Sequence, residues 1–259
     1  MLTIILCVEY DGTDYFGWQS QPNKKTIQDE LNYAIRKALG FDYVVNGAGR
    51  TDAGVHSTGQ IAHFICEEEP MLSKIHGIPR HKVKLAINQK LSKNIRVKRL
   101  WFSELEFHSR FDAVMREYRY RFSRRPSVFN QRFTTFFPYK MDLELLFNSA
   151  EIFLGKNNFY TFSKTNSTNS DYCCEIIKCQ WQQIADSSFE LTVIADRFVY
   201  GMVRAMVGAM IDIARTKRTV DEISFALKNQ NRELASPLAP STGLNLHRIY
   251  YEKPFEIIV

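Results

Sequence analysis

The residues best suited to chemistry lie in one glycine-rich segment, residues 47–56, which reads GAGRTDAGVH. It places one carboxylate, Asp52, among small side chains, where a bulky planar group can reach it. Glycines on both sides permit unusual backbone angles and the close approach of a ligand. An aspartate that caps its own turn would fit the same pattern. The segment matches neither GxxxxGK[ST] nor GxGxxG, so a nucleotide-phosphate loop is not predicted.

A second unusual residue is Arg204, which interrupts the apolar stretch 199–211. A helix that is apolar all round is typical of a buried helix, and a guanidinium inside it needs a carboxylate or several other acceptors. A structural ion pair, or a side chain that extends to the surface, would satisfy it equally. Pairing Asp52 with Arg204 would serve both residues, because a nearby positive charge keeps a carboxylate ionised. This pairing is a hypothesis based on chemistry, because the spacing of two residues in the sequence cannot show that they meet.

The elements that must position these residues follow from periodicity, caps and turn residues. Thr26 and Gly40 are the expected ends of one helix, Asp142 and Gly155 of another, and three further helices are expected at 83–91, from 199 and from 221. Strands are expected at 2–8, 43–45, 61–66, 95–102, 113–122, 176–183, 189–195 and 246–251. The order predicts an α+β fold of two halves, residues 1–107 and 108–259, each a sheet backed by helices. The polar segment 163–171 is expected to be a mobile loop or a plain connector.

Composition narrows the setting of the protein. The 259 residues carry a formal charge of +6, which favours a polyanionic partner, although a modestly basic soluble protein would look the same. Five cysteines without a regular framework or zinc-ligand spacing indicate a reducing, cytoplasmic compartment and no metal site. Residues 2–8 are too few for a signal peptide and 199–214 are too few for a membrane span, so no membrane association is expected.

Beyond these arguments, the sequence resembles a known family in several blocks that follow one another in family order. The segment GAGRTDAGVHSTGQIAHF resembles the GRTDxGVH motif of the TruA-type tRNA pseudouridine synthases. The blocks VEYDGTDYFGWQSQ, TIQDEL, FHSRF, REYRY, MVRAMVG and APSTGLNL resemble further conserved segments of that family, between residues 8 and 246. Two departures are Cys174, in a stretch where the family usually has an arginine, and Asn245, where an aromatic residue is common.

The resemblance implies a fold, a reaction and a set of site residues. The fold is two RRM-like (ferredoxin-like) halves that form an extended, mainly antiparallel sheet with helices on one face and a central active-site cleft. Asp52 is the nucleophile toward uridine, Arg50 helps to extrude the base, Tyr118 stacks on it and Arg204 pairs with Asp52. The substrate-binding set is Arg50, His56, Arg110, Tyr118, Arg119 and Arg121. The implied substrates are uridines 38, 39 and 40 of the tRNA anticodon arm, modified by a homodimer without a metal or an organic cofactor.

The chemistry fits those roles. Isomerising uridine needs a nucleophile or base near both ring and sugar, and a carboxylate can serve. A base stacked in a stem must first be flipped out, and an aromatic platform recovers part of that cost. Candidates for backbone contacts are the basic residues Arg80, Lys82, Lys84, Arg119, Arg121, Arg124, Arg125, Arg215, Lys217 and Arg218.

Three alternatives remain open. A catalytically silent RNA-binding protein could keep the same fold, although the presence of all four catalytic candidates argues against it. A pseudouridine synthase that acts at other RNA positions would share the same motifs. An aspartate-dependent hydrolase or phosphotransferase would normally need Mg²⁺ and further acids near the loop, and the acids Glu67, Glu68 and Glu69 lie beyond a strand.

Overall fold

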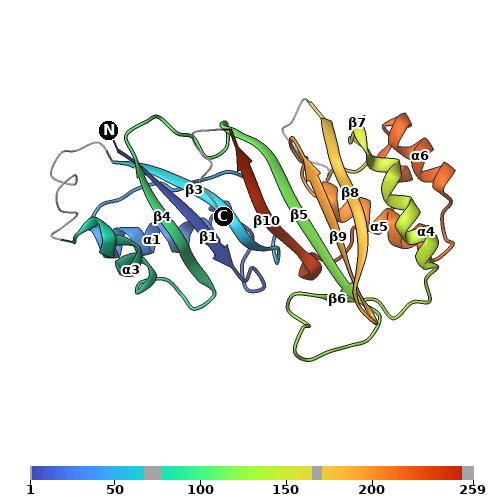
Figure 1. Cartoon of the computed structure of the whole chain (residues 1–259), viewed down its shortest axis with the longest axis horizontal. Helices are drawn as coiled ribbons and strands as arrows, with labels where there is room; N and C mark the ends of the chain where they lie inside the picture. The colour runs from blue at the N-terminus through green and yellow to red at the C-terminus, as the bar shows by residue number, and fades with distance from the viewer. Residues whose placement is uncertain (1, 67–77, 165–170, 253–259) are drawn as a thin grey trace. The chain divides into compact units, whose positions relative to one another are not determined.

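The computed structural model describes residues 2–66, 78–164 and 171–252 (Figure 1). The chain forms two compact units. The first unit comprises residues 1–114 and 246–259, and the second comprises residues 115–245. The expected break after residue 107 therefore differs from the observed division in two respects: it falls seven residues early, and it assigns the last strand to the second half. Most of the expected loop at 163–171 and the acids at 67–69 lie outside the described residues.

The first unit is a sheet in the order β4-β1-β3-β10, with β2 paired to β3. Its elements are β1 (Leu2–Tyr10), α1 (Ile27–Leu39), β2 (Asn46–Gly47), β3 (His56–Cys66), α3 (Arg80–Asn88), β4 (Ile95–Ser103) and β10 (Leu244–Tyr251). The strand β1 runs antiparallel to both β3 and β4. Its alternate residues Leu2, Ile4, Leu6 and Val8 form one core with apolar side chains of α1 and α3, so both helices cover the same face of the sheet.

Local signals explain the ends of α1. The side chain of Thr26 accepts a hydrogen bond from the backbone N–H of Asp29, as expected for an N-cap. Gly40 ends the helix with φ 79°, a conformation that favours glycine. Within the helix, the buried Gln28 donates from Nε2 to the carbonyl oxygen of Val45 and accepts from the N–H of Ser20. The bond to Gln28 occupies the carbonyl oxygen of Val45, and residues 43–45 are irregular. The strand expected at 43–45 is therefore wrong, because strand pairing begins only at Asn46.

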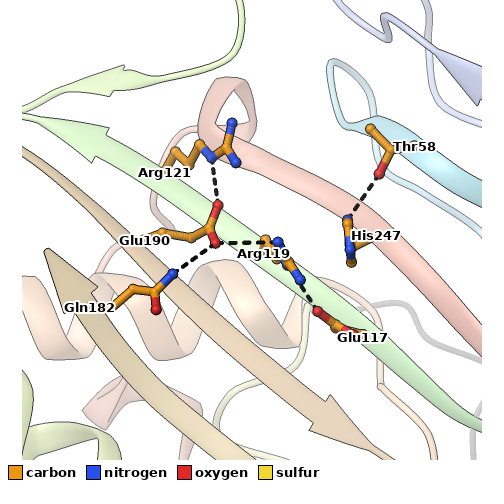
Figure 2. A network of polar contacts seen from close by, with 7 residues as sticks. All are labelled: Thr58, Glu117, Arg119, Arg121, Gln182, Glu190 and His247. Atoms are coloured by element: carbon orange, nitrogen blue, oxygen red, sulfur yellow. Dashed lines mark hydrogen bonds and ion pairs between the residues drawn. The ribbon is translucent and has the colours of Figure 1, made fainter. Parts of the chain in front are cut away.

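The last strand, β10, joins the first unit through contacts with β3. Ser57 Oγ donates to the carbonyl oxygen of Leu246, and Thr58 Oγ1 lies 3.1 Å from Nδ1 of His247 (Figure 2). A Cβ on Gly59 would lie 2.2 Å from the carbonyl oxygen of His247, so only glycine fits this approach. Pairing between strands so distant in sequence leaves no local signal, which is why the sequence did not indicate the pairing of β10 with β3.

The second unit is a sheet in the order β5-β9-β8-β7, with the short β6 parallel to β5. Its strands are β5 (Ala113–Ser123), β6 (Thr135–Phe136), β7 (Gly155–Asn158), β8 (Cys173–Ala185) and β9 (Ser188–Ala195). Its helices are α4 (Leu143–Asn148), η1 (Ser149–Phe153), α5 (Met202–Ala214), α6 (Val220–Asn229), η2 (Arg232–Leu234) and η3 (Ser241–Gly243). The helix that was expected from Asp142 to Gly155 is α-helical for only six residues and continues as a 3₁₀ helix.

One face of this second sheet packs on helices and the other is polar. Phe122, Phe189 and Trp181 meet ring to ring on the packed face, and the Trp181 indole donates to Sδ of Met210 in α5. Most residues of α5 are buried, as the apolar stretch predicted. The α+β class is therefore confirmed in each unit. No helix within the described residues is long and apolar enough to cross a membrane.

Candidate active site

Asp52 lies in the loop between β2 and β3, and this loop, residues 48–55, is hereafter the aspartate loop. Thr51 and Val55 are buried, Asp52 is half-buried and Arg50 is exposed. The N–H of Val55 donates to the carbonyl oxygen of Asp52, which closes a tight turn. The turn lies between the buried residues Thr51 and Val55, and the exposed Arg50 precedes it on the outside.

A second loop, residues 11–18, holds the aspartate loop backbone to backbone. The N–H of Trp18 donates to the carbonyl oxygen of Thr51, and the N–H of Gly54 donates to that of Tyr15. Gly17 has φ 90°, and a Cβ there would lie 2.4 Å from the carbonyl oxygen of Thr51. The loop 11–18, hereafter the aromatic loop, therefore requires glycine at residue 17, where it lies against the backbone around Asp52.

Side chains from β1 and β3 hold the aspartate loop from inside. The Tyr10 hydroxyl lies 2.9 Å from Oγ1 of Thr51, and Gln60 Nε2 donates to the carbonyl oxygen of Gly49 at 2.7 Å. Burial raises the pKa of the Tyr10 phenol, which stays protonated. Together with the backbone bonds, these contacts fix the loop at several points, as pre-organised catalysis requires.

His56, which was expected to contact RNA, is buried at the start of β3. Its Nδ1 accepts from the N–H of Gly12 at 3.1 Å and lies 3.3 Å from Oδ1 of Asp11. In the structure, His56 therefore holds the loop 11–18 in place through Gly12 and Asp11. An RNA contact of His56 stays a prediction.

Arg110 is exposed in the segment 107–111, beside the exposed ring of Phe111. This segment is held by His63 of β3, whose Nδ1 accepts from the N–H of Ser109 at 3.1 Å. Burial, with the neighbouring His108 imidazole, lowers the pKa of His63 to about 4. His63 is therefore neutral at neutral pH, and sequence patterns did not single it out.

Tyr118 and Arg204 belong to the second unit, whereas Asp52 belongs to the first. Tyr118 is buried on β5, and its ring meets Phe198 edge to face, with centroids 4.9 Å apart. Arg204 is half-buried in α5, and not fully buried as the apolar helix suggested. Its Nε donates to the carbonyl oxygen of Ala239 at 2.7 Å, and the N–H of Ala239 donates back to the carbonyl oxygen of Arg204. The pairing of Arg204 with Asp52 stays a prediction.

Arg119 and Arg121 lie on the polar face of β5 (Figure 2). Tyr118 faces the other side of the sheet, because successive residues of a strand alternate. Arg119 Nε lies 2.9 Å from Oε1 of Glu117, and Arg121 Nε lies 2.5 Å from Oε2 of Glu190. Arg119 also lies 3.6 Å from Glu190. The two glutamates are buried, so both expected RNA-binding arginines compensate carboxylates that sequence reasoning overlooked.

Comparisons with known proteins identify the family. The tRNA pseudouridine synthase family model matches residues 6–112 and 149–252. The tRNA pseudouridine synthase A of Chlamydia felis is 34% identical over 259 residues, covering 98% of this chain and 94% of that protein. The proteins of the same name from Bacillus pumilus and Acetivibrio thermocellus are each 34% identical, covering 95% and 97% of this chain and 97% and 100% of their own lengths.

The chain belongs to the tRNA pseudouridine synthase family, and it is an isomerase that converts uridine to pseudouridine. The resemblance in the sequence is thereby confirmed. The family match includes the aspartate loop and α5 but not residues 113–148, where Tyr118, Arg119 and Arg121 lie.

Proposed function

We propose that the protein converts uridines 38, 39 and 40 of the tRNA anticodon arm to pseudouridine, with Asp52 as the nucleophile. The observation that carries the proposal is the aspartate loop, in which a half-buried carboxylate stands on a backbone fixed by Tyr10, Trp18 and Gln60. The names of the relatives, each a tRNA pseudouridine synthase A, support tRNA as the substrate. The choice of uridines 38, 39 and 40 comes from the resemblance of the sequence motifs to those of the TruA-type family.

The reaction breaks the bond between N1 of the uracil and C1′ of the ribose and joins C1′ to C5. The proton on C5 leaves to solvent, and N1 gains a proton, so the product has the composition of the substrate. In the proposed mechanism Asp52 attacks either the ring or C1′ and forms a transient covalent bond. Arg50, an exposed residue of the aspartate loop, occupies the space that the extruded base leaves, and Tyr118 stacks on that base. Arg204 pairs with Asp52 in the assembled site.

Loss of the C5 proton gives a direct test. Transfer RNA labelled with tritium at C5 of uridine should release tritium to water with the wild-type protein and without added metal. The Asp52→Asn variant should bind the same tRNA with nearly wild-type affinity but release no tritium. The isosteric amide preserves the turn around Asp52 while it removes the nucleophile. Release by the variant would contradict the role of Asp52.

The position of the modified uridines needs a separate measurement. Transcripts that keep only uridine 38, 39 or 40 should each be converted, and a transcript that lacks all three should release no tritium. Conversion only at other positions would support the alternative of a pseudouridine synthase with a different RNA target. Tight binding without any release would favour a catalytically silent RNA-binding protein.

We also propose that the protein acts as a homodimer in the cytoplasm. The resemblance to dimeric relatives supports the first part. The five cysteines, all of which are free thiols, support a reducing compartment. Light scattering coupled to size-exclusion chromatography should give twice the mass of one chain, and the mass of a single chain would contradict the dimer.

A further inference from the structure

One short stretch of the chain carries many positive charges and no negative ones. Eight Lys and Arg residues, and no Asp or Glu, occur between residues 80 and 103: Arg80, Lys82, Lys84, Lys90, Lys93, Arg96, Lys98 and Arg99. Their charge exceeds the formal +6 of the whole chain, so the remainder carries a net charge of −2. Residues 80–103, which include α3 and β4, therefore contribute strongly to the basic character that suggested a polyanionic partner.

The fold brings these cations together on one edge of the first unit. The strand β4 is the outer strand of the sheet, and α3 immediately precedes it in the chain. Lys84 Nζ donates to the backbone carbonyl oxygen of Lys98, which links the helix to the strand. Arg80 lies over the ring of Phe102, with its guanidinium carbon 5.2 Å from the centroid. Arg80 and Lys84 are thus aligned along β4 while their side chains stay exposed.

An irregularity in β4 adds two adjacent cations. Cys7 of β1 pairs with Arg99, whereas the next residue, Val8, pairs with Val97, so Lys98 has no opposite residue. Such a bulge interrupts the alternation of a strand, and Lys98 and Arg99 are both exposed as a result. Lys98 contacts Glu9 and the carbonyl oxygen of Thr58. Among the described residues, no carboxylate lies within ion-pair distance of Arg80, Lys84, Arg96 or Arg99.

The surface is also hollowed. A shallow depression of about 530 Å³ is lined by two arginines, a lysine, a histidine and three apolar side chains: Arg80, His81, Lys84, Arg99, Leu100, Trp101 and Phe102. An open hollow lined by both cations and apolar side chains matches a phosphodiester backbone better than a small enclosed ligand. A phosphate oxygen accepts hydrogen bonds from the guanidinium and ammonium groups, and the ribose can pack against the rings.

We propose that the α3–β4 surface, defined by Arg80, Lys84 and Arg99, binds the phosphodiester backbone of the tRNA substrate. This inference rests on the proposed function but assigns a separate surface, on the outer strand of the first sheet. The aspartate loop precedes β3, and β1 lies between β3 and β4. The surface therefore contacts a part of the RNA other than the uridine under modification. Its contribution falls on affinity and on the dependence of affinity on salt.

The test compares two triple variants that remove the same charge. Arg80→Gln/Lys84→Gln/Arg99→Gln removes three cations of the α3–β4 surface. Lys37→Gln/Lys140→Gln/Lys228→Gln removes three exposed lysines elsewhere. The dissociation constant for fluorescently labelled tRNA is measured over a series of KCl concentrations. The first variant should bind at least about tenfold more weakly, with a slope of log Kd against log salt that is lower by about 2–3; the second should behave like the wild type.

Two further measurements make the outcome decisive. The conservative variant Arg80→Lys/Arg99→Lys keeps the charge and should recover most of the affinity and the slope. In turnover assays the glutamine variant should raise KM far more than it lowers kcat. Equal losses in both triple variants, or wild-type binding by the first, would overturn the proposal. Charge-dependent binding without tritium release from wild type would reject the proposed function yet support this surface.

Discussion

Gly17 meets Thr51 backbone to backbone: a Cβ on Gly17 would lie 2.4 Å from the carbonyl oxygen of Thr51 and 3.1 Å from the carbonyl carbon of Asp52. The aromatic loop and the aspartate loop can approach this closely only because residue 17 has no side chain. The position of the carboxylate therefore depends on a glycine that takes no part in the chemistry.

The variant Gly17→Ala should lose most activity and some stability. A methyl group must push the two loops apart, and φ 90° is itself unfavourable for alanine by about 1–2 kcal/mol. The control is Gly155→Ala, where φ is 81° but no atom lies within 4 Å of the added carbon. Thermal unfolding should show a loss in both variants, whereas kcat should fall only for Gly17→Ala. Equal kcat in the two variants would mean that the close approach does not position Asp52.

Replacing Arg204 by methionine should both destabilise the second unit and impair turnover. The change removes the donor to the carbonyl oxygen of Ala239, a loss of about 1–3 kcal/mol if that oxygen finds no other partner. Urea unfolding measures the first effect, and the rate of tritium release from labelled tRNA measures the second. Lower stability with an unchanged rate would restrict Arg204 to its structural role.

The variant Glu190→Gln should destabilise the protein without weakening RNA binding. It removes the buried carboxylate between Arg119 and Arg121 and should cost about 2 kcal/mol or more in the free energy of unfolding. The exposed Glu144→Gln is a matched control and should change stability very little. Because two guanidinium groups lose a neutralising partner, tRNA affinity at low salt should stay the same or rise. A large loss of affinity would show that the ion pairs present the arginines to RNA.

Stability should fall in mild acid because of His63. Its pKa is about 4 in the folded protein, below the ordinary value of 6.5, so the unfolded chain takes up a proton first as the pH falls. The contribution of neutral His63 to the free energy of unfolding is therefore complete above pH 6.5 and is lost as the pH falls toward about 4. This contribution is at most about 3 kcal/mol. His63→Asn should be less stable than wild type at neutral pH but should lose less stability on acidification. Parallel unfolding curves for both proteins across this range would exclude His63 as the cause.

The sequence predicted those features that depend on neighbouring residues. The caps Thr26 and Gly40 and the apolar character of α5 are local, and the structure confirms them. The bulge at Lys98 and the strand pairing of β10 depend on distant partners, so no window of sequence revealed them. For the same reason the buried Glu117 and Glu190 were overlooked beside Arg119 and Arg121.

The candidate site divides in the same way. The resemblance selected Asp52 through its motif, and the structure adds the contacts of Tyr10, Trp18 and Gln60 that hold its loop. Arg204 was expected to have a carboxylate or several other acceptors as partners. The backbone carbonyl oxygen of Ala239 is one such acceptor, and residue types alone could not identify it. The joint geometry of Asp52, Tyr118 and Arg204, including the expected central cleft, stays a prediction.

The return of β10 to the first unit has a consequence for synthesis on the ribosome. The strand β3 borders β10, yet β10 is made only after the whole of the second unit. A nascent chain that has just completed β4 therefore holds a sheet with one open edge along β3, and such edges pair readily with other chains. The N-terminal half of the protein reaches its final form last, when residues 246–251 emerge from the exit tunnel.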